Sequence, residues 1–236
     1  MAKVSREKFK VLDDVFDKFT IRNLFTLATK AGFDEDTLSP ISIGKEANVF
    51  SAKKDGSKGR VAVKVYRLET ADFNRMYEYI RSDPRFEHLE KRRRKIIFAW
   101  CQREYRNLLV TREAGVKAPR PIAFLDNTLA MEFIGNGNAA PMLKDGPFSN
   151  PQAGFEKIIT YIRRYYKAGY VHGDLSKFNI LNHDEEPVLI DFSQATPLRN
   201  PIAEELLERD VKNVCDYFRR RGVEAKVEEV LKRIRE

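Results

Sequence analysis

The sequence predicts an α+β protein of two lobes, in which strands come first along the chain and helices dominate later. Residues 48–52 and 60–66 have the apolar pattern of strands, whereas the longer patterns after residue 150 have helical spacing. A loop near 135–147, rich in glycine and proline, interrupts regular structure and predicts a hinge between the lobes. A chain of 236 residues can bury such cores without disulfides or structural metals.

The individual elements follow from changes in hydrophobic period and from cap residues. Helical spacing predicts a helix over residues 5–19 with Ser5 as its cap, and a second helix that begins at Thr20 and ends at Gly32. The stretch 69–95 is charged and only weakly periodic. The remaining predicted elements are, in order, strands at 48–52 and 60–66, a helix at 96–114, a strand at 129–134, a helix at 151–168, two short strands on either side of 182–187, and helices at about 201–220 and 225–235.

The positive charge is concentrated in one quarter of the chain. The formal net charge is +8, yet residues 60–120 contain 16 basic and 8 acidic residues while the rest contains 27 of each. This distribution excludes a uniformly basic protein of the histone type. It indicates a neutral body with one basic element, the run Lys91–Lys95, which suits an anionic partner such as nucleic acid or phosphate.

The two cysteines, Cys101 and Cys215, lie in helix-like patterns and have no metal-ligand spacing. A disulfide stays open as an alternative, but this usage favours a reduced cytosolic protein. No apolar run approaches the ~18 residues of a membrane span. The first ten residues have no apolar signal core, so we expect a soluble cytoplasmic protein.

The strongest chemical pattern consists of Asp174, Asn179 and Asp191, which accompany two short apolar strands. Oxygen-bearing side chains of this kind can hold Mg²⁺ against nucleotide phosphates, and a further carboxylate can accept a hydroxyl proton. The spacing Asp-x4-Asn followed by Asp after an apolar strand is that of a kinase catalytic loop and metal-binding loop.

Each of these residues also has a purely structural interpretation. Asp174 could form a turn, Asn179 an Asx-turn, and Asp191 a strand-end cap. His172 is better explained by packing or backbone support than by acid–base chemistry, and residues 184–186 by a solvated turn.

Lys64 stands in an apolar strand, where an unpaired ammonium would be costly to bury. Glu104, on an amphipathic helix, is the carboxylate that fits best, while Glu90 and Glu113 fit the spacing less well. The alternative is a lysine that reaches solvent from an edge strand. The preceding segment 41–50 has one glycine and fails the G-x-G-x-x-G pattern, although its backbone can still contact phosphate.

Together these motifs resemble the RIO family of atypical serine/threonine protein kinases, and most of all its type-1 branch of archaeal type. The resemblance extends over about residues 10–233. The segments that carry it are Gly44–Ala47, Val63–Tyr66, Asp72–Phe73, Tyr77–Ile80, Asp83–Phe86, Glu104–Leu108, Met131–Gly135, His172–Asn179, Ile190–Ala195 and Leu207–Val211. At Ile43 the phosphate segment departs from the family, which has Thr or Glu there.

The resemblance implies a trimmed bilobal protein-kinase-like fold, with a small β-rich N-lobe, a helical C-lobe, extra N-terminal helices and no long activation loop. It implies one catalytic domain over 1–236, divided near residues 134 and 135 into N-lobe and C-lobe. The number of residues after Asp191 agrees with this trimmed fold, because we expect residues 192–236 to be too few for the large peptide-docking lobe of ordinary kinases. The segment ahead of Gly44 is too short for the winged-helix domain of the type-2 branch.

The resemblance also implies ATP with Mg²⁺ or Mn²⁺, and a kinase or ATPase activity with a phosphoaspartate at Asp191. The implied roles are as follows: Lys64, paired with Glu104, holds the α- and β-phosphates; Ser42, Gly44 and Lys45 approach the phosphates; Met131, Glu132 and Ile134 line the adenine pocket; Asp174 is catalytic, with Ser176 beside it; Asn179 and Asp191 bind the metal.

The implied partner is the precursor of the small ribosomal subunit, whose maturation involves this family. Its rRNA would be contacted through the basic segment 81–95, with Arg81, Arg85 and Lys91–Lys95 on phosphates and Tyr77, Tyr79 and Phe86 on bases. The alternative is a solvated helix start whose aromatic residues pack inward. A monomer without membrane contact is expected, and Ser82 is the candidate for autophosphorylation.

Two other functions fit parts of the pattern. Small-molecule kinases of the aminoglycoside or choline type share His-Gly-Asp, Asn and Asp, but the segment between Met131 and Val171 is short for their substrate-gripping insertions. A catalytically idle RNA-binding scaffold would use the basic segment alone, which the intact set Lys64, Asp174, Asn179 and Asp191 disfavours.

Overall fold

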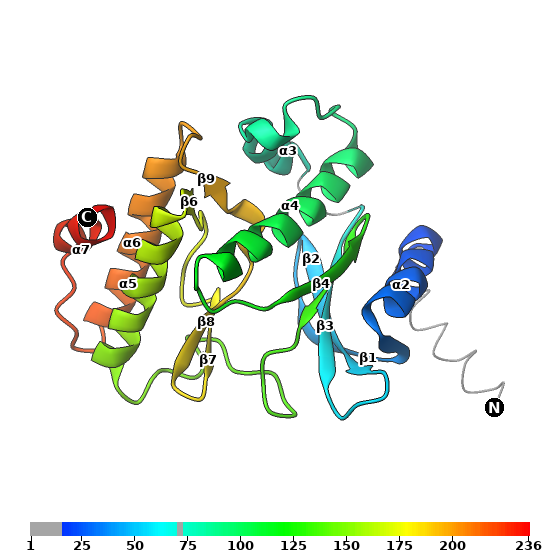
Figure 1. Cartoon of the computed structure of the whole chain (residues 1–236), viewed down its shortest axis with the longest axis horizontal. Helices are drawn as coiled ribbons and strands as arrows, with labels where there is room; N and C mark the ends of the chain where they lie inside the picture. The colour runs from blue at the N-terminus through cyan, green and yellow to red at the C-terminus, as the bar shows by residue number, and fades with distance from the viewer. Residues whose placement is uncertain (1–15, 70–72) are drawn as a thin grey trace. The chain divides into compact units, whose positions relative to one another are not determined.

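The structure is a computed structural model that describes residues 16–69 and 73–236. The chain forms two compact units (Figure 1). Of the described residues, the first unit contains 16–69 and 73–77 together with Leu89–Tyr105 and Pro121–Phe133, and the second contains Glu78–His88, Arg106–Arg120 and Ile134–Glu236. The long helix α4 (Arg93–Glu113) therefore contributes its first part to one unit and its last part to the other.

The first unit is built on a five-stranded antiparallel sheet in the order β1-β2-β3-β5-β4. Its strands are β1 (Phe33–Ile43), β2 (Ala47–Lys54), β3 (Arg60–Tyr66), β4 (Pro121–Leu125) and β5 (Thr128–Glu132). Helix α2 (Lys18–Ala31) packs on β4 and β5, and its Leu24 and Leu27 share a core with Val63 and Ala130. The predicted strands at 48–52, 60–66 and 129–134 are confirmed.

Two strands that the sequence did not predict, β1 and β4, are the edges of this sheet. Strand β1 is largely polar and contains Pro40, where its register with β2 shifts, and β4 begins at Pro121. Proline is tolerated at a sheet edge or at the first residue of a strand, because no ladder hydrogen bond is lost there. Pro40 and Pro121 therefore lie in edge strands.

Helix α2 begins earlier than predicted. Its N-cap is Asp17 and not Thr20: the Asp17 carboxylate accepts hydrogen bonds from the amides of Phe19 and Thr20 and from the Thr20 hydroxyl. Gly32, with φ of 66°, ends the helix as predicted. Of the predicted helix 5–19, residues 5–15 with the Ser5 cap lie outside the described residues, as does Asp72.

The charged stretch 69–95 contains more structure than its weak periodicity suggested. Helix α3 spans Phe73–Arg81, buries Met76 and Ile80 one turn apart, and is followed by a short 3₁₀ turn, Pro84–Phe86. Helix α4 begins at Arg93, three residues before the predicted start, so part of the basic run belongs to its first turn.

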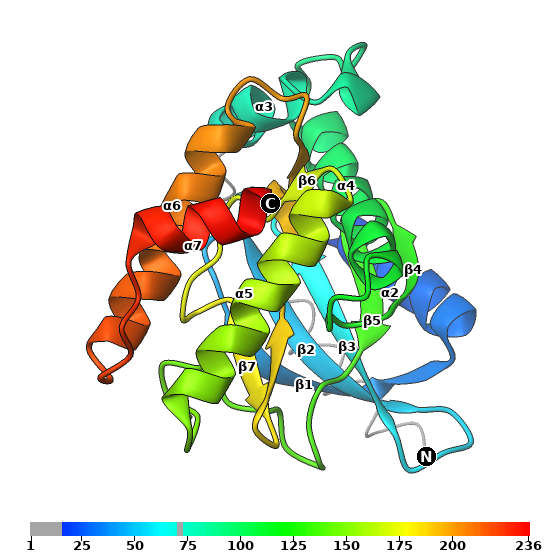
Figure 2. The same cartoon turned by 60° about the vertical axis from the view of Figure 1, so that its left-hand side comes forward.

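The second unit contains three complete helices and two small two-stranded sheets, and Figure 2 shows these helices together. The helices are α5 (Pro151–Lys167), α6 (Ala203–Arg219) and α7 (Val227–Arg235). One sheet pairs β6 (Tyr170–Val171) with β9 (Thr196–Pro197), and the other is the hairpin of β7 (Ile180–His183) and β8 (Glu186–Leu189). Phe155 and Phe218 meet edge to face in the helical core, with ring centroids 5.4 Å apart. Only residues 192–202 separate Asp191 from α6, so a long activation loop is absent from this described stretch, as predicted.

Both cysteines are buried with free thiols, which agrees with the reduced state that the sequence favoured. Burial raises the pKa of the Cys101 thiol well above its usual value and raises that of Cys215 to about 11. Within the described ranges, no helix has the length and apolar character needed to cross a bilayer.

Gly154 on α5 generates a prediction about stability. A Cβ placed there would lie 2.2 Å from Cδ2 of Phe148, whose ring stacks on that of Phe218. Glycine to alanine in a helix normally stabilises by ~1 kcal/mol, whereas overpacking costs ~1–3 kcal/mol. We expect Gly154→Ala to lower the unfolding free energy by about 1 kcal/mol in urea denaturation. Gln152→Ala, exposed on the same helix, is the control and should change it by less than ~0.5 kcal/mol; a Gly154→Ala variant as stable as the parent would contradict the packing argument.

Candidate active site

A buried ion pair lies at the centre of the first unit. Lys64 Nζ on β3 is 2.9 Å from Oε1 of Glu104 on α4, and the two side chains are only 7% and 1% exposed. The other carboxylate oxygen of Glu104 accepts a hydrogen bond from the Tyr66 hydroxyl. Because β3 is an interior strand, Lys64 has no route to solvent along an edge, and the snorkelling alternative is wrong. Removing either partner of such a pair costs ~3–5 kcal/mol, since the other charge stays buried.

The predicted phosphate segment forms the turn between β1 and β2. Ser42 is half-buried on β1, and Lys45 is exposed in the turn. Gly44 donates its amide to the Ala47 carbonyl at 3.1 Å, and a Cβ at Gly44 would approach that oxygen to 2.7 Å. The turn therefore requires glycine, although the segment lacks the three-glycine pattern.

The predicted adenine-pocket residues lie at the end of β5 and just beyond it. Met131 pairs with Ala62 and Glu132 with Val61, and both are half-buried. Ile134 follows the strand and belongs to the second unit, where its carbonyl accepts the amide of Ala140 at 2.9 Å.

In the second unit, Asp174, Ser176 and Asn179 belong to one turn that precedes β7. The Asn179 side-chain amide donates to the Asp174 carbonyl at 2.7 Å and to its carboxylate at 3.2 Å, and the Asn179 backbone amide donates to the Ser176 carbonyl at 2.9 Å. Because the Asn179 nitrogen is used in this way, its amide oxygen is the atom that suits a metal ion. Asn179 thus supports the turn through donation to Asp174 and not through the bond of an Asx-turn, and this support is compatible with its functional interpretation.

Asp191 lies at the same end of the β7–β8 hairpin as Asn179. Ile180 pairs with Leu189, and the Ile190 amide donates to the Asn179 carbonyl at 3.0 Å. Asp191 itself adopts a left-handed conformation, with φ of 61°, and accepts a hydrogen bond from Ser193 at 2.7 Å. Non-glycine residues in this region are strained and concentrate at functional sites.

The donor set of Asn179 and Asp191 fits a hard divalent cation, which prefers oxygen ligands. Over the described ranges, no cluster of three His, Cys, Asp or Glu side chains exists that could hold a metal by itself. Asn179 and Asp191 would therefore hold Mg²⁺ or Mn²⁺ only together with oxygen ligands from outside the protein.

Asp210, to which the sequence assigned no role of its own, holds the turn that carries Asp174. Its carboxylate, 1% exposed on α6, accepts the amides of Gly173 at 2.7 Å and Leu175 at 2.8 Å. Burial raises its pKa to about 7, against these hydrogen bonds and the charge of Arg209, which lower it. The sequence could have indicated this role, because Asp210 stands on the apolar face of a predicted helix, where a carboxylate needs a partner.

Gly173 and His172 complete the support of this turn. Gly173 has φ of +80°, and a Cβ there would lie 2.9 Å from the Gln194 carbonyl. His172 Nε2 is 3.1 Å from the Ile190 carbonyl, and its ring lies 4.6 Å from that of Phe192. His172 therefore packs and contacts backbone, as the sequence favoured.

Comparison with known proteins places these residues in a family. The sequence model of the RIO domain matches residues 48–231. The chain belongs to the RIO kinase family. Relatives named RIO-type serine/threonine-protein kinase Rio1 are 42% identical in Haloferax volcanii, over 93% of this chain and 75% of that protein, and 42% identical in Methanocaldococcus jannaschii, over 97% and 78%. The Saccharomyces cerevisiae serine/threonine-protein kinase RIO1 is 33% identical over 98% of this chain and 54% of its own length.

Solved RIO structures share the fold. The Rio2 kinase of Chaetomium thermophilum, crystallised as an ADP/Mg²⁺-phosphoaspartate complex, matches with a TM-score of 0.66 at 23% identity. The match covers 89% of this chain and 64% of the Rio2 chain. The α+β, protein-kinase-like fold class and the type-1 assignment are thereby confirmed. This RIO kinase is a serine/threonine kinase that carries out ATP-dependent phosphoryl transfer, and the small-molecule kinase alternative is not favoured.

The raised pKa of Asp210 generates a prediction about pH. In the folded state Asp210 keeps a proton that the unfolded chain releases near pH 3.8, so protonation of Asp210 stabilises the fold. This stabilisation is fully present below pH 3.8 and is lost as the pH rises through about 7. We expect the unfolding free energy of the parent, relative to that of Asp210→Asn, to fall on the order of 2 kcal/mol between pH 5 and 8. Denaturation at both pH values measures this.

Asp216→Asn, on the exposed side of the same helix, is the control and should show a constant difference from the parent. A parent–Asp210→Asn difference that is equally constant would show that Asp210 is ionised in the fold throughout this range.

Proposed function

We propose that the chain binds ATP and Mg²⁺, and that the Lys64–Glu104 pair in the first unit and the Asp174–Asn179–Asp191 group in the second each take part in phosphoryl transfer. The observation that carries this proposal is the end of the β7–β8 hairpin, where the oxygen ligands Asn179 and Asp191 adjoin Asp174. Family membership supports it, and so does the ADP/Mg²⁺ complex of the Rio2 relative.

Each residue has a chemical role in this proposal. Lys64 neutralises the α- and β-phosphates, and Glu104 keeps it oriented. The turn with Ser42, Gly44 and Lys45 contacts phosphate through backbone amides and side chains. The adenine pocket is lined by Met131, Glu132 and Ile134, and Ser176 lies beside the transferred phosphoryl group. A bound Mg²⁺ supplies neutralisation of the developing phosphate charge.

The transfer step uses Asp174 as the group that receives the acceptor's proton. The acceptor hydroxyl oxygen forms a bond to the γ-phosphorus while the bond from the γ-phosphorus to the β,γ-bridging oxygen breaks, and ADP leaves. When no hydroxyl substrate is present, the Asp191 carboxylate attacks instead and forms an acyl phosphate, which water then hydrolyses. The phosphoaspartate of the Rio2 relative supports this second course.

Metal-dependent ATP turnover tests the proposal. We expect Asp174→Asn to lower the rate of Mg²⁺-dependent ADP release by roughly 100-fold or more, because the group that takes the proton of an attacking hydroxyl or of the hydrolytic water is lost. Asp191→Ala should abolish both turnover and labelling of the protein by γ-labelled ATP, and hydroxylamine should release the label from the parent. Asp216→Asn serves as the control. Turnover of Asp191→Ala equal to that of the parent would overturn the assignment.

We propose further that this RIO kinase acts in the cytoplasm on precursors of the small ribosomal subunit and contacts their rRNA through Lys91–Lys95. All five side chains are exposed. Lys91, Arg93 and Arg94 each lie over an aromatic ring within 5.3 Å of its centroid, and Arg92 and Lys95 pair with Glu90. A surface that alternates cations and rings suits single-stranded RNA, which offers phosphates and base faces.

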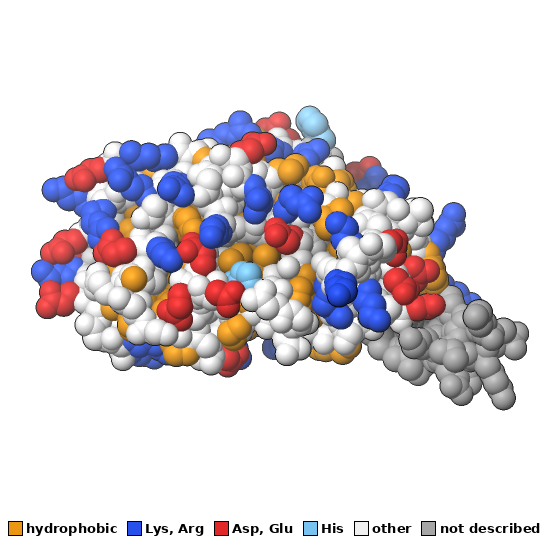
Figure 3. Space-filling view, turned by 60° about the horizontal axis from the view of Figure 1, so that its bottom comes forward, with side chains coloured by type: hydrophobic (Ala, Val, Ile, Leu, Met, Phe, Trp, Pro, Cys, Tyr) orange, Lys and Arg blue, Asp and Glu red, His pale blue; other side chains and the backbone are white. Residues whose placement is uncertain are grey.

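Two of the RNA-contacting residues that the sequence predicted outside Lys91–Lys95 are not accessible. Arg85 is largely buried in an ion pair with Asp83, and Phe86 is 8% exposed, so neither is available to RNA. On the face in Figure 3, basic and acidic side chains are interspersed.

Charge reversal tests the RNA contact. The triple change Arg92→Glu, Arg93→Glu and Arg94→Glu should weaken binding to precursor particles and reduce the slope of log affinity against log salt by about 2. The control reverses Lys53, Lys54 and Lys58, which are exposed on β2 and in the following turn and give the same change in net charge. Equal losses in both triples would show that total charge, and not this surface, determines binding.

A further inference from the structure

A fully buried asparagine on α4 holds the segment that follows Asp191. The Asn107 side-chain nitrogen donates to the carbonyls of Phe192 and Ala195, at 2.8 Å each, and Asn107 itself is 0% exposed. Its side-chain oxygen accepts a hydrogen bond from Arg85 Nη1 at 3.0 Å. Both N–H donors and the oxygen are therefore engaged, which fixes the orientation of the amide.

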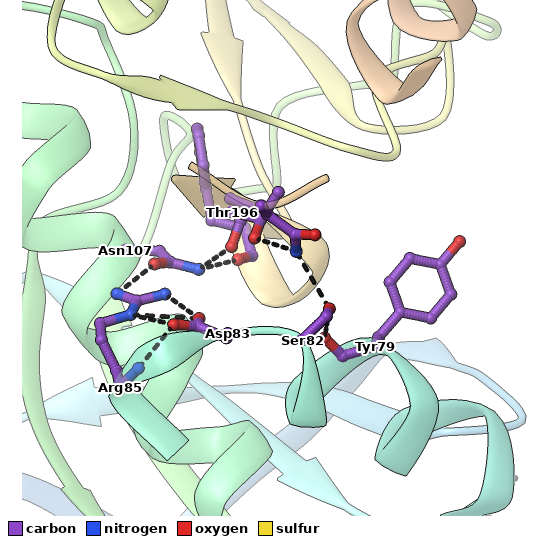
Figure 4. A network of polar contacts seen from close by, with 9 residues as sticks. Tyr79, Ser82, Asp83, Arg85, Asn107 and Thr196 are labelled. Atoms are coloured by element: carbon purple, nitrogen blue, oxygen red, sulfur yellow. Dashed lines mark hydrogen bonds and ion pairs between the residues drawn. The ribbon is translucent and has the colours of Figure 1, made fainter. Parts of the chain in front are cut away.

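Arg85 is itself fixed by a buried carboxylate (Figure 4). Asp83, which is 0% exposed, accepts from the Arg85 Nε at 3.0 and 3.1 Å and from its Nη2 at 2.6 Å. This forked arrangement leaves Nη1 directed at Asn107, as planar guanidinium geometry requires. The Asp83–Arg85 pair thus acts as a brace that selects one orientation of the Asn107 amide.

A second connection joins the same two segments. The Asn200 side-chain nitrogen donates to the Ser82 hydroxyl at 3.0 Å and to the Thr196 hydroxyl at 2.9 Å, and Ser82 donates to the Tyr79 carbonyl at 2.9 Å. The hydroxyl of Ser82 is thereby used as donor and acceptor. Residues 79–85 consequently hold residues 192–196 at two points, through Asn107 and through Asn200.

We propose that Asn107 is a positioning residue for phosphoryl transfer, which sets the place of the Asp191 carboxylate by clamping the Phe192 and Ala195 carbonyls. The inference rests on the proposed function, in which Asp191 binds the metal. Asp191 directly precedes the clamped turn. Its backbone is in the left-handed conformation although it is not a glycine. Such a conformation persists only where neighbouring structure holds it, and the clamp supplies that constraint.

Asn107→Asp separates the hydrogen bonds to the Phe192 and Ala195 carbonyls from the hydrogen bond with Arg85. The new carboxylate can still accept from Arg85, but it replaces two N–H donors by an oxygen that repels the carbonyls of Phe192 and Ala195. Loss of such supporting bonds lowers metal affinity by roughly 10- to 100-fold. We expect the Mg²⁺ concentration for half-maximal ATP turnover to rise ~10-fold, while nucleotide binding in EDTA is unchanged. Amide hydrogen exchange of residues 191–197 should accelerate.

Arg85→Lys gives a second, milder variant. Lysine retains the ion pair with Asp83 but lacks the fork that reaches Asn107, so a smaller shift in the same direction is expected. Asn182→Asp is the matched control. Its amide also donates to two carbonyls, Gly146 at 3.1 Å and Pro147 at 3.4 Å, and its oxygen accepts the Glu185 amide, yet it lies away from the Asp191 turn.

The outcomes separate positioning from plain stability. A folded Asn107→Asp variant whose Mg²⁺ requirement and exchange rates at 191–197 equal those of the parent would overturn the proposal. So would an equal shift in Asn182→Asp, which would indicate a general loss of stability. If Asp191→Ala turns over ATP like the parent, the proposed function fails, and the positioning role fails with it even when exchange is faster.

Discussion

The burial of a lysine charge inside the sheet is the constraint on which the first unit depends. Lys64 is surrounded by apolar strand residues and requires the Glu104 carboxylate, so α4 must lie with that residue against β3. Tyr66 adds a hydroxyl to the second carboxylate oxygen, which reduces the freedom of Glu104 further. The same helix carries Asn107 one turn later. A single helix therefore bears both the ion-pair partner of Lys64 and the amide that holds the Asp191 turn.

In the second unit, buried side chains hold the two turns next to Asp174 and Asp191. The turn at Asp174 is held by the Asp210 carboxylate, and the turn after Asp191 by the Asn107 amide. In both cases a buried polar side chain bonds to two main-chain groups of a turn. An unsatisfied buried group would be costly, which makes each arrangement specific.

The sequence predicted what is encoded locally. Interior strands, the main helices and the spacing of Asp174, Asn179 and Asp191 are visible in hydrophobic period and in short motifs. The edge strands β1 and β4 were missed because polar residues and proline, which are normally evidence against a strand, are tolerated at edges. Whether Lys64, Asp174, Asn179 and Asp191 act on one nucleotide stays a prediction that spacing and family support.

Residues that act through contacts distant in the sequence cannot be recognised from local sequence patterns. Asn107 and Phe192 are 85 positions apart, and Asp210 and Gly173 are 37 apart, so no short motif connects them. The structure disfavours Arg85 and Phe86 as RNA contacts. Arg85 is held by Asp83 and Asn107, Phe86 is buried, and a count of basic and aromatic residues does not reveal burial.

The two buried thiols have a practical consequence for spectroscopy. A thiol-selective probe reacts with the thiolate, and burial suppresses both access to Cys101 and Cys215 and their ionisation. A cysteine introduced at an exposed position of the native chain would therefore be labelled almost alone, without prior removal of the natural ones. Pairs of such sites, one in each unit, would provide fluorescence distance measurements during nucleotide turnover in an otherwise unaltered protein.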